Sequence, residues 1–200
     1  MDRREFKKKI AGWDDSSRDI RVERWSELIP ATFTADLPHL IWRYITEAED
    51  MYIYGFFIGV IMLCAGTMEL TLSDQIASRL KISERDISRF ELQQFITLAH
   101  SLGMLSDSEA FDLDQFRFLR NTLIHGNSGK LKEMSKKLYQ VNGFDEKPSV
   151  ETYLNPATGN GINQDALRFL GLTRSIIMRF YGEKTPAVQS DSQVTEYSEP

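Results

Sequence analysis

Helical periodicity is the feature of this sequence that most constrains its fold. In nearly every patterned segment the apolar residues recur every three to four positions, which is the spacing of one face of an α-helix. No stretch alternates apolar and polar residues in the manner of a half-buried strand. The pattern therefore predicts an all-α protein, a bundle of four to six helices around one hydrophobic core.

The 200 residues suit one domain with short appendages. We expect an N-terminal helical extension over residues 1–35, a helical bundle over 36–182 and a disordered tail over 183–200. The extension is expected to hold a basic helix from Arg3 to Ile10 and a second helix from Arg18 to Ile29. The tail has few large apolar side chains, so it lacks the surface that a folded segment must bury.

Local signals mark where the helices of the first half of the bundle begin and end. A long helix or helix pair is expected from Pro38 to Leu80. A capping box that begins at Ser83 predicts a helix that continues to Leu102 and stops at Gly103. The polar segment 106–112 is then expected to be a connection.

The second half of the bundle shows the same kind of signals. A helix is predicted from Asp112 or Leu113 to Ile124, with Gly126 after it, because glycine accepts the left-handed conformation that ends helices. A charged helix over 130–141 and a long loop over 143–163 are expected to follow. The apolar spacing from Leu167 to Phe180 predicts a last amphipathic helix.

One uncharged run, residues 51–68 (MYIYGFFIGVIMLCAGTM), reaches the lower length limit for a membrane span. Glycines and tyrosines dilute the run, and charged helical sequence continues on both sides. These features favour a buried core helix, and we expect no membrane contact. Gly55 and Gly59 lie four residues apart, a spacing that permits close packing of helices.

The chain offers little for metal or redox chemistry. Its single cysteine, Cys64, lies in an apolar segment and is expected to be a small buried hydrophobe rather than a nucleophile. The histidines His39 and His100 lack neighbouring ligands at metal-binding spacing. We therefore expect no metal and no cofactor. A charged N-terminus without an apolar segment, together with the lone cysteine, predicts a cytoplasmic protein.

Charge is distributed unevenly along the chain. The net charge of −5 argues against a protein that coats nucleic acid non-specifically. Between Arg117 and Lys137, however, six Lys and Arg residues stand against a single acid, Glu133. This cluster is either an ordinary solvated helix face or a surface that contacts phosphate. In the second case the candidate substrate-binding residues are Lys130, Lys132 and Lys136.

The segment FRFLRNTLIHGN, residues 116–127, places three polar residues where leucine or alanine would pack at lower cost. Asn121 precedes His125 by four positions, so the two lie one helical turn apart on the same face. Arg120 lies about 7.5 Å from His125 along the helix axis and about 140° around it. A long arginine side chain can still reach the helix end, so a compact polar patch is feasible there.

These three residue types suit cleavage of RNA without a metal. Histidine titrates near neutral pH and can serve as base or acid, while arginine offers a fork matched to phosphate oxygens. A purely structural interpretation stays open beside this one. In it, His125 complements the helix dipole, Arg120 forms an ion pair with Glu69, and Asn121 is an interior hydrogen-bonding residue.

At these residues the sequence resembles the HEPN superfamily of helical domains. That family is marked by an Arg, usually followed by a polar residue such as Asn, and by a His four to six residues later near a helix end. Arg120, Asn121 and His125 match the shortest allowed spacing. The segment 91–126 is similar to the third and fourth helices of the family, and 53–76 to its earlier apolar helix with an embedded Glu. The resemblance covers about residues 45–140.

The resemblance implies a homodimer in which two motif helices form a composite site for metal-independent cleavage of RNA, leaving a 2′,3′-cyclic phosphate. It implies that His125 is the general base or acid, that Arg120 stabilises the phosphate, and that Asn121 orients one of them or contacts RNA. Many such proteins are toxins or phage-defence proteins neutralised by an antitoxin or nucleotidyltransferase-like partner.

The segments LAHSLGML and LRNTLIHG also resemble the mannitol-repressor group. In that group the same spacing occurs in a regulatory helical protein. A non-catalytic regulatory or protein-interaction module is therefore the alternative function.

Overall fold

The computed structural model describes residues 17–28, 37–125, 129, 153–154 and 161–182. Within these residues the protein is all-α and contains no strand, as the periodicity predicts. The labelled helices are α2 (His39–Tyr54), α3 (Phe57–Leu80), α4 (Glu84–Ile87), α5 (Leu92–Ser101), α6 (Asp107–Ile124) and α9 (Ile162–Tyr181). Residues 17–27 form a further helix. The predicted elements over 3–10, 130–141 and 183–200, most of the 143–163 loop, and Gly126 lie outside the described residues.

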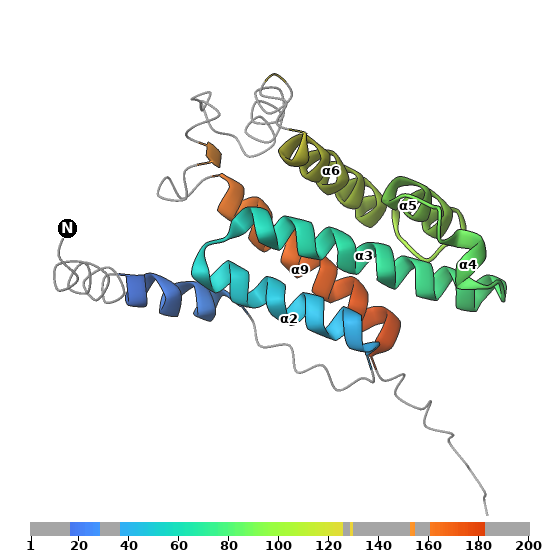
Figure 1. Cartoon of the computed structure of the whole chain (residues 1–200), viewed down its shortest axis with the longest axis horizontal. Helices are drawn as coiled ribbons and strands as arrows, with labels where there is room; N and C mark the ends of the chain where they lie inside the picture. The colour runs from blue at the N-terminus through green and yellow to red at the C-terminus, as the bar shows by residue number, and fades with distance from the viewer. Residues whose placement is uncertain (1–16, 29–36, 126–128, 130–152, 155–160, 183–200) are drawn as a thin grey trace, which may run out of the picture.

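Helix α3 is the central element of the bundle. It packs against α2 and α9 on one side and against α5 and α6 on the other (Figure 1). Because it has neighbours on both sides, its buried surface is wide and includes two threonines as well as apolar residues. Its fully buried apolar side chains are Val60, Ile61, Cys64, Ala65, Met68, Leu72 and Ile76.

The sequence leaves either one long helix or a helix pair open between Pro38 and Leu80, and the structure shows a pair that divides at Gly55. The backbone there is left-handed, with φ +83°, and the N–H groups of Gly55 and Phe56 donate to the carbonyls of Tyr52 and Met51 at 3.0 and 2.8 Å. This is the hydrogen-bond pattern of a Schellman C-cap. The uncharged run 51–68 is therefore shared between two helices. Among the described helices, α3 is long and apolar enough to cross a membrane by length and composition, and half of its most apolar window is buried.

The prediction of one helix from Ser83 to Leu102 is wrong. The short α4 ends at Ile87, and α5 begins after a second capping box, in which the N–H of Glu91 donates to Oε1 of Gln94 at 2.8 Å. Two capping boxes in succession start two helices instead of one. The predicted stop at Gly103 is confirmed, because this glycine has a φ of +67°.

The predicted start of α6 is also wrong. The helix begins at Asp107, about one and a half turns before Asp112, and residues 107–112 belong to the helix rather than to a connection. Ser106 is the N-cap: its Oγ accepts from the N–H of Glu109 at 3.3 Å, and its N–H donates to the Glu109 carboxylate at 2.9 Å. The motif residues therefore lie farther from the start of their helix than the sequence predicts.

Helix α9 runs antiparallel to α6, and side chains of the two helices are in contact. The rings of Phe116 and Phe169 stack with their centroids 4.0 Å apart. Two ion pairs lie between this stack and the start of α6, from Arg168 to Asp112 and from Arg179 to Glu109, the second at 2.9 Å. Together with the packing of α6 against α3 and α5, these contacts determine which residues of α6 face solvent.

The helix at 17–27 attaches to the bundle mainly through arginines. Nη1 of Arg24 donates to the carbonyl of Ile53 at 3.2 Å, and its guanidinium lies 5.0 Å from the centroid of the Phe57 ring. Tyr52 donates to Glu27, and Leu28 joins the hydrophobic core. The described part of the N-terminal extension thus packs on the turn between α2 and α3.

Replacing glycine by alanine is expected to change the stability of the protein in opposite directions at two positions. Gly55→Ala is expected to destabilise the protein by about 1–2 kcal/mol, because alanine is strained at positive φ and its Cβ would lie 2.6 Å from Nη1 of Arg24. Gly171→Ala, in the interior of α9 with open space in front of it, is expected to stabilise it by roughly 0.5–1 kcal/mol. Urea unfolding followed by circular dichroism measures both. Equal effects of the two substitutions would contradict this account of the α2–α3 turn.

Candidate functional site

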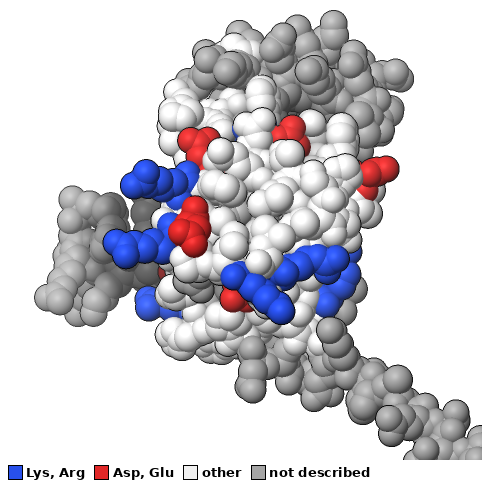
Figure 2. Space-filling view, turned by 90° about the vertical axis from the view of Figure 1, so that its right-hand side faces the viewer, with Lys and Arg blue, Asp and Glu red and all other residues white. Residues whose placement is uncertain are grey.

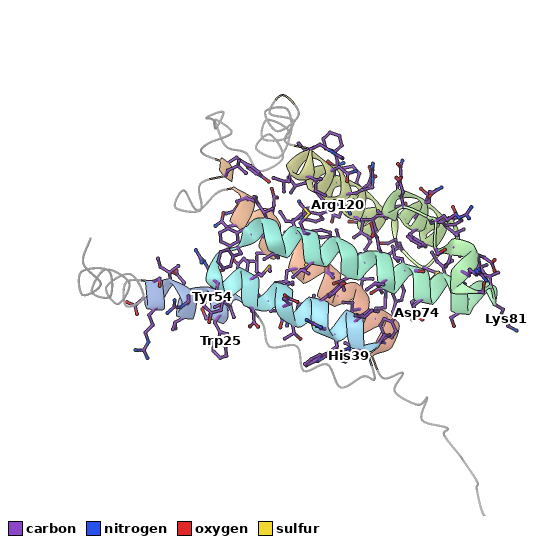
Figure 3. All side chains as sticks on the ribbon, viewed as in Figure 1. Trp25, His39, Tyr54, Asp74, Lys81 and Arg120 are labelled. Carbon is purple, nitrogen blue, oxygen red and sulfur yellow. The ribbon has the colours of Figure 1, made fainter. Side chains whose placement is uncertain are left out.

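The side chain of Arg120 lies at the edge of α6 that faces α3 (Figure 3). Its Nη1 donates to Oδ1 of Asn121 at 3.0 Å. Its Nη2 lies 3.9 Å from Oε1 of Glu69, which comes from the middle of α3. The structure therefore brings together Arg120 and Asn121, and it also contains the ion pair that the structural interpretation of the sequence named.

This ion pair is long and remains open to solvent. The side chain of Arg120 is 31% exposed and that of Glu69 is 35% exposed. One turn earlier on α6, Arg117 pairs with Asp114 at 2.8 Å, more than 1 Å closer. Arg120 is thus held loosely by its carboxylate, and its guanidinium is accessible from solvent.

Burial and two charged neighbours act on Glu69. Burial raises the pKa of Glu69 above its ordinary value, and this effect outweighs the guanidinium of Arg120, which lowers it. The carboxylate of Glu91 raises the pKa of Glu69 further. The acid beside Arg120 is therefore easier to protonate than an ordinary glutamate.

His125 lies at the C-terminal end of α6 and is exposed. The backbone N–H of His125 donates to the carbonyl of Asn121 at 3.1 Å, which completes the last turn of the helix. Among the described residues no side-chain hydrogen bond joins His125 to Arg120 or Asn121, so the predicted patch is only partly assembled within one chain. The imidazole stands in solvent, where it can meet a substrate or a second subunit.

Helix α6 carries exposed large apolar side chains that the sequence did not reveal. Phe111 is 64% exposed, Phe118 is 36% exposed and Ile124 is 52% exposed. Phe111, Phe118 and His125 are spaced by seven residues, which places them along one line on the helix. We call these three residues the outer stripe. The signal that would have revealed it is this spacing, offset from the residues that form the core side of α6.

The other candidate residues have different outcomes. Lys130, Lys132 and Lys136 lie outside the described residues, so phosphate contact by the basic cluster stays a prediction. Cys64 is fully buried as predicted, and burial raises the pKa of its thiol to about 12. His100 forms a 2.7 Å contact with Asp107 at the start of α6.

Charges on the end of the bundle at α4 do not form a continuous basic groove. Figure 2 shows Lys and Arg side chains on this face in separate groups, with acidic side chains and uncharged surface between them. No group of three or more His, Cys, Asp or Glu residues that could hold a metal ion occurs in the described part of the chain.

A cavity of about 400 Å³ lies between α9 and the end of the 17–28 segment. Its walls are mainly apolar, with Arg174 among the polar lining residues. Arg174 forms a 3.3 Å ion pair with Glu49 of α2. No residue of α6 lines this cavity, so it is separate from the candidate site.

Comparison with known proteins yields no relative: no family model matches the chain, and neither a curated protein nor a solved structure matches it significantly.

Because the ion pair between Arg120 and Glu69 is long and exposed, Arg120 is expected to contribute little to the stability of the fold. Arg120→Met is expected to change the free energy of unfolding by less than about 1 kcal/mol, as for other solvent-exposed ion pairs. Arg174→Met is the matched control, because Arg174 is only 11% exposed and pairs with Glu49 at 3.3 Å. Loss of that partner is expected to cost roughly 3 kcal/mol. If urea unfolding showed a similar loss for Arg120→Met, the arginine would be a structural residue.

Proposed function

We propose that the protein is a metal-independent endoribonuclease of HEPN type that cuts RNA at a composite site formed by two copies of α6. The observation that carries this proposal is the state of the motif residues. The Arg120 guanidinium is oriented by Asn121 yet partly exposed, and an exposed imidazole, His125, lies at the end of the same helix. A site that acts on a polymer needs such accessible groups.

The chemistry follows from these groups. The imidazole of His125 takes the proton of the 2′-hydroxyl, and the 2′-oxygen attacks the adjacent phosphorus. The guanidinium of Arg120 stabilises the charge that builds on the phosphoryl oxygens. The bond to the 5′-oxygen breaks as that oxygen receives a proton, which leaves a 2′,3′-cyclic phosphate and a 5′-hydroxyl. The imidazole of a second subunit can supply this proton.

The outer stripe supports assembly into a homodimer. Exposed phenylalanines on the same line as His125 favour contact with another apolar surface. Association of two copies through α6 would bury these rings and bring two motif helices together. By resemblance, we also propose a cytoplasmic protein of the toxin or phage-defence type, without membrane contact, neutralised by an antitoxin or nucleotidyltransferase-like partner.

The alternative is a non-catalytic regulatory or interaction module of the mannitol-repressor type. The ion pair between Arg120 and Glu69 favours it, because it gives the arginine a role within one chain. In this case α6 would serve only to bind another protein.

Cleavage of RNA tests the first function directly. Purified protein in EDTA is expected to cut a single-stranded RNA and leave cyclic phosphate ends. Both His125→Ala and Arg120→Ala are expected to lower the rate by at least about 100-fold, the usual effect of removing a general acid–base group or a charge-stabilising group. His100→Ala is the matched control, since it removes another exposed helix-end histidine. Equal cleavage by the parent protein and His125→Ala would exclude this site.

Oligomeric state tests the role of the outer stripe. Phe118→Glu is expected to convert the dimer to a monomer, because it places a charge in the surface to be buried. Light scattering after size exclusion measures the mass. Ile82→Glu, at another exposed apolar position near α4, is the control and is expected to leave the dimer intact. A dimer that survives Phe118→Glu would place the interface elsewhere.

A further inference from the structure

We infer that Glu69 is a positioning residue of the candidate site, whose carboxylate holds the Arg120 guanidinium until an RNA phosphate displaces it. The inference rests on the proposed function and adds to it a regulation of the same site. It predicts that the site binds phosphate more tightly when Glu69 is protonated.

The geometry shows how one guanidinium is shared. Arginine presents five N–H donors in a planar fork. In Arg120 one of these is directed to Asn121 at 3.0 Å, while the nearest approach to Glu69 is 3.9 Å, longer than a hydrogen bond. A phosphate oxygen would therefore compete with Glu69 for the guanidinium of Arg120. The hydrogen bond from Arg120 to Asn121 could remain in place.

The position of Glu69 explains why this carboxylate benefits from a cationic partner. Its neighbour Met68 and the next-turn Leu72 are fully buried, so the glutamate stands at the margin of the hydrophobic core. Its side chain remains 35% exposed, so water and a nearby cation together offset the cost of its partial burial. Among the described residues, Arg120 is the cation that forms an ion pair with it. The arginine that the site requires for phosphate thus also neutralises a carboxylate of the core helix.

The charged groups around Glu69 determine the direction in which the affinity for phosphate changes with pH. Arg120 approaches from α6, and Glu91 from the start of α5. On the side of α2 and α9, Glu49 and Arg174 pair with each other at 3.3 Å. Because burial raises the pKa of Glu69, protonation begins closer to neutral pH than for an ordinary glutamate. A protonated Glu69 no longer attracts the guanidinium, so affinity for phosphate should rise as the pH falls.

The experiment uses the full chain with His125→Ala throughout, so that RNA is not cut and this imidazole does not titrate. Binding of a fluorescent single-stranded RNA of about 12 nucleotides is measured by anisotropy. Between about pH 8 and about pH 5 the dissociation constant is expected to fall about fivefold, the size of one exposed ion pair. With Glu69→Gln added, binding should be tight at every pH. The control is Glu49→Gln, which removes a carboxylate that pairs with Arg174 on the other side of α3. This variant should keep the fivefold change in the dissociation constant.

A second measurement separates this inference from the proposed function. Inorganic phosphate is titrated into the same variants, and the Nε–Hε resonance of Arg120 is followed by NMR. If no variant binds RNA but phosphate binds Arg120 more tightly in Glu69→Gln, the ribonuclease proposal fails and the role of Glu69 stands. If phosphate affinity and its pH dependence are the same with and without the Glu69→Gln substitution, the inference is overturned.

A second variant, Glu69→Asp, replaces Glu69→Gln if the latter does not fold. It keeps the negative charge and shortens the side chain. It is expected to bind phosphate more tightly than the parent at about pH 8, because the carboxylate is farther from Arg120, and to retain a pH dependence. Unchanged affinity in Glu69→Asp would also overturn the inference, since a merely structural glutamate would not alter phosphate binding.

Discussion

The burial of α3 is the constraint on which the rest of the structure depends. This helix has neighbours on two sides, and its apolar residues form the middle of the core. A charged group on it is therefore costly unless it finds a partner at the margin of that core. Asp74 accepts from Tyr181 of α9, and Glu69 faces Arg120 of α6. The core helix thus supplies the carboxylate that lies beside the motif arginine, and it links the candidate site to the packing of the bundle.

Much of this architecture could be predicted from local sequence. The all-α class, the left-handed Gly103 and the last amphipathic helix follow from apolar spacing and from glycine, whereas the choice between one long helix and a helix pair before Leu80 stayed open. The predictions fail where capping residues decide the boundary. Ser106 and Glu109 form a capping box inside a segment that looks like a polar linker, because the first turns of α6 are rich in acids. A helix start can be more polar than the loop before it.

The sequence names candidate members of the site but not their arrangement. Spacing placed Asn121 and His125 on one face, and it left two interpretations of Arg120 open. Which one applies depends on how α6 is rotated relative to α3, and that rotation is set by distant contacts such as the stack of Phe116 on Phe169. Periodicity within one helix carries no information about such a contact. The exposure of Phe111 and Phe118 escaped prediction for the same reason, since apolar residues are usually assigned to the core.

The attachment of residues 17–28 has a consequence for how the molecule opens. Within this described segment, Leu28 is the one large apolar side chain that joins the core, and the other contacts are made by arginines, Tyr52 and a glutamate. Such contacts remove little apolar surface from water, whereas α3 is buried over much of its length. The backbone amides of the 17–27 helix should therefore exchange with solvent long before those of the bundle, so that the described chain behaves as two cooperative units of unequal stability.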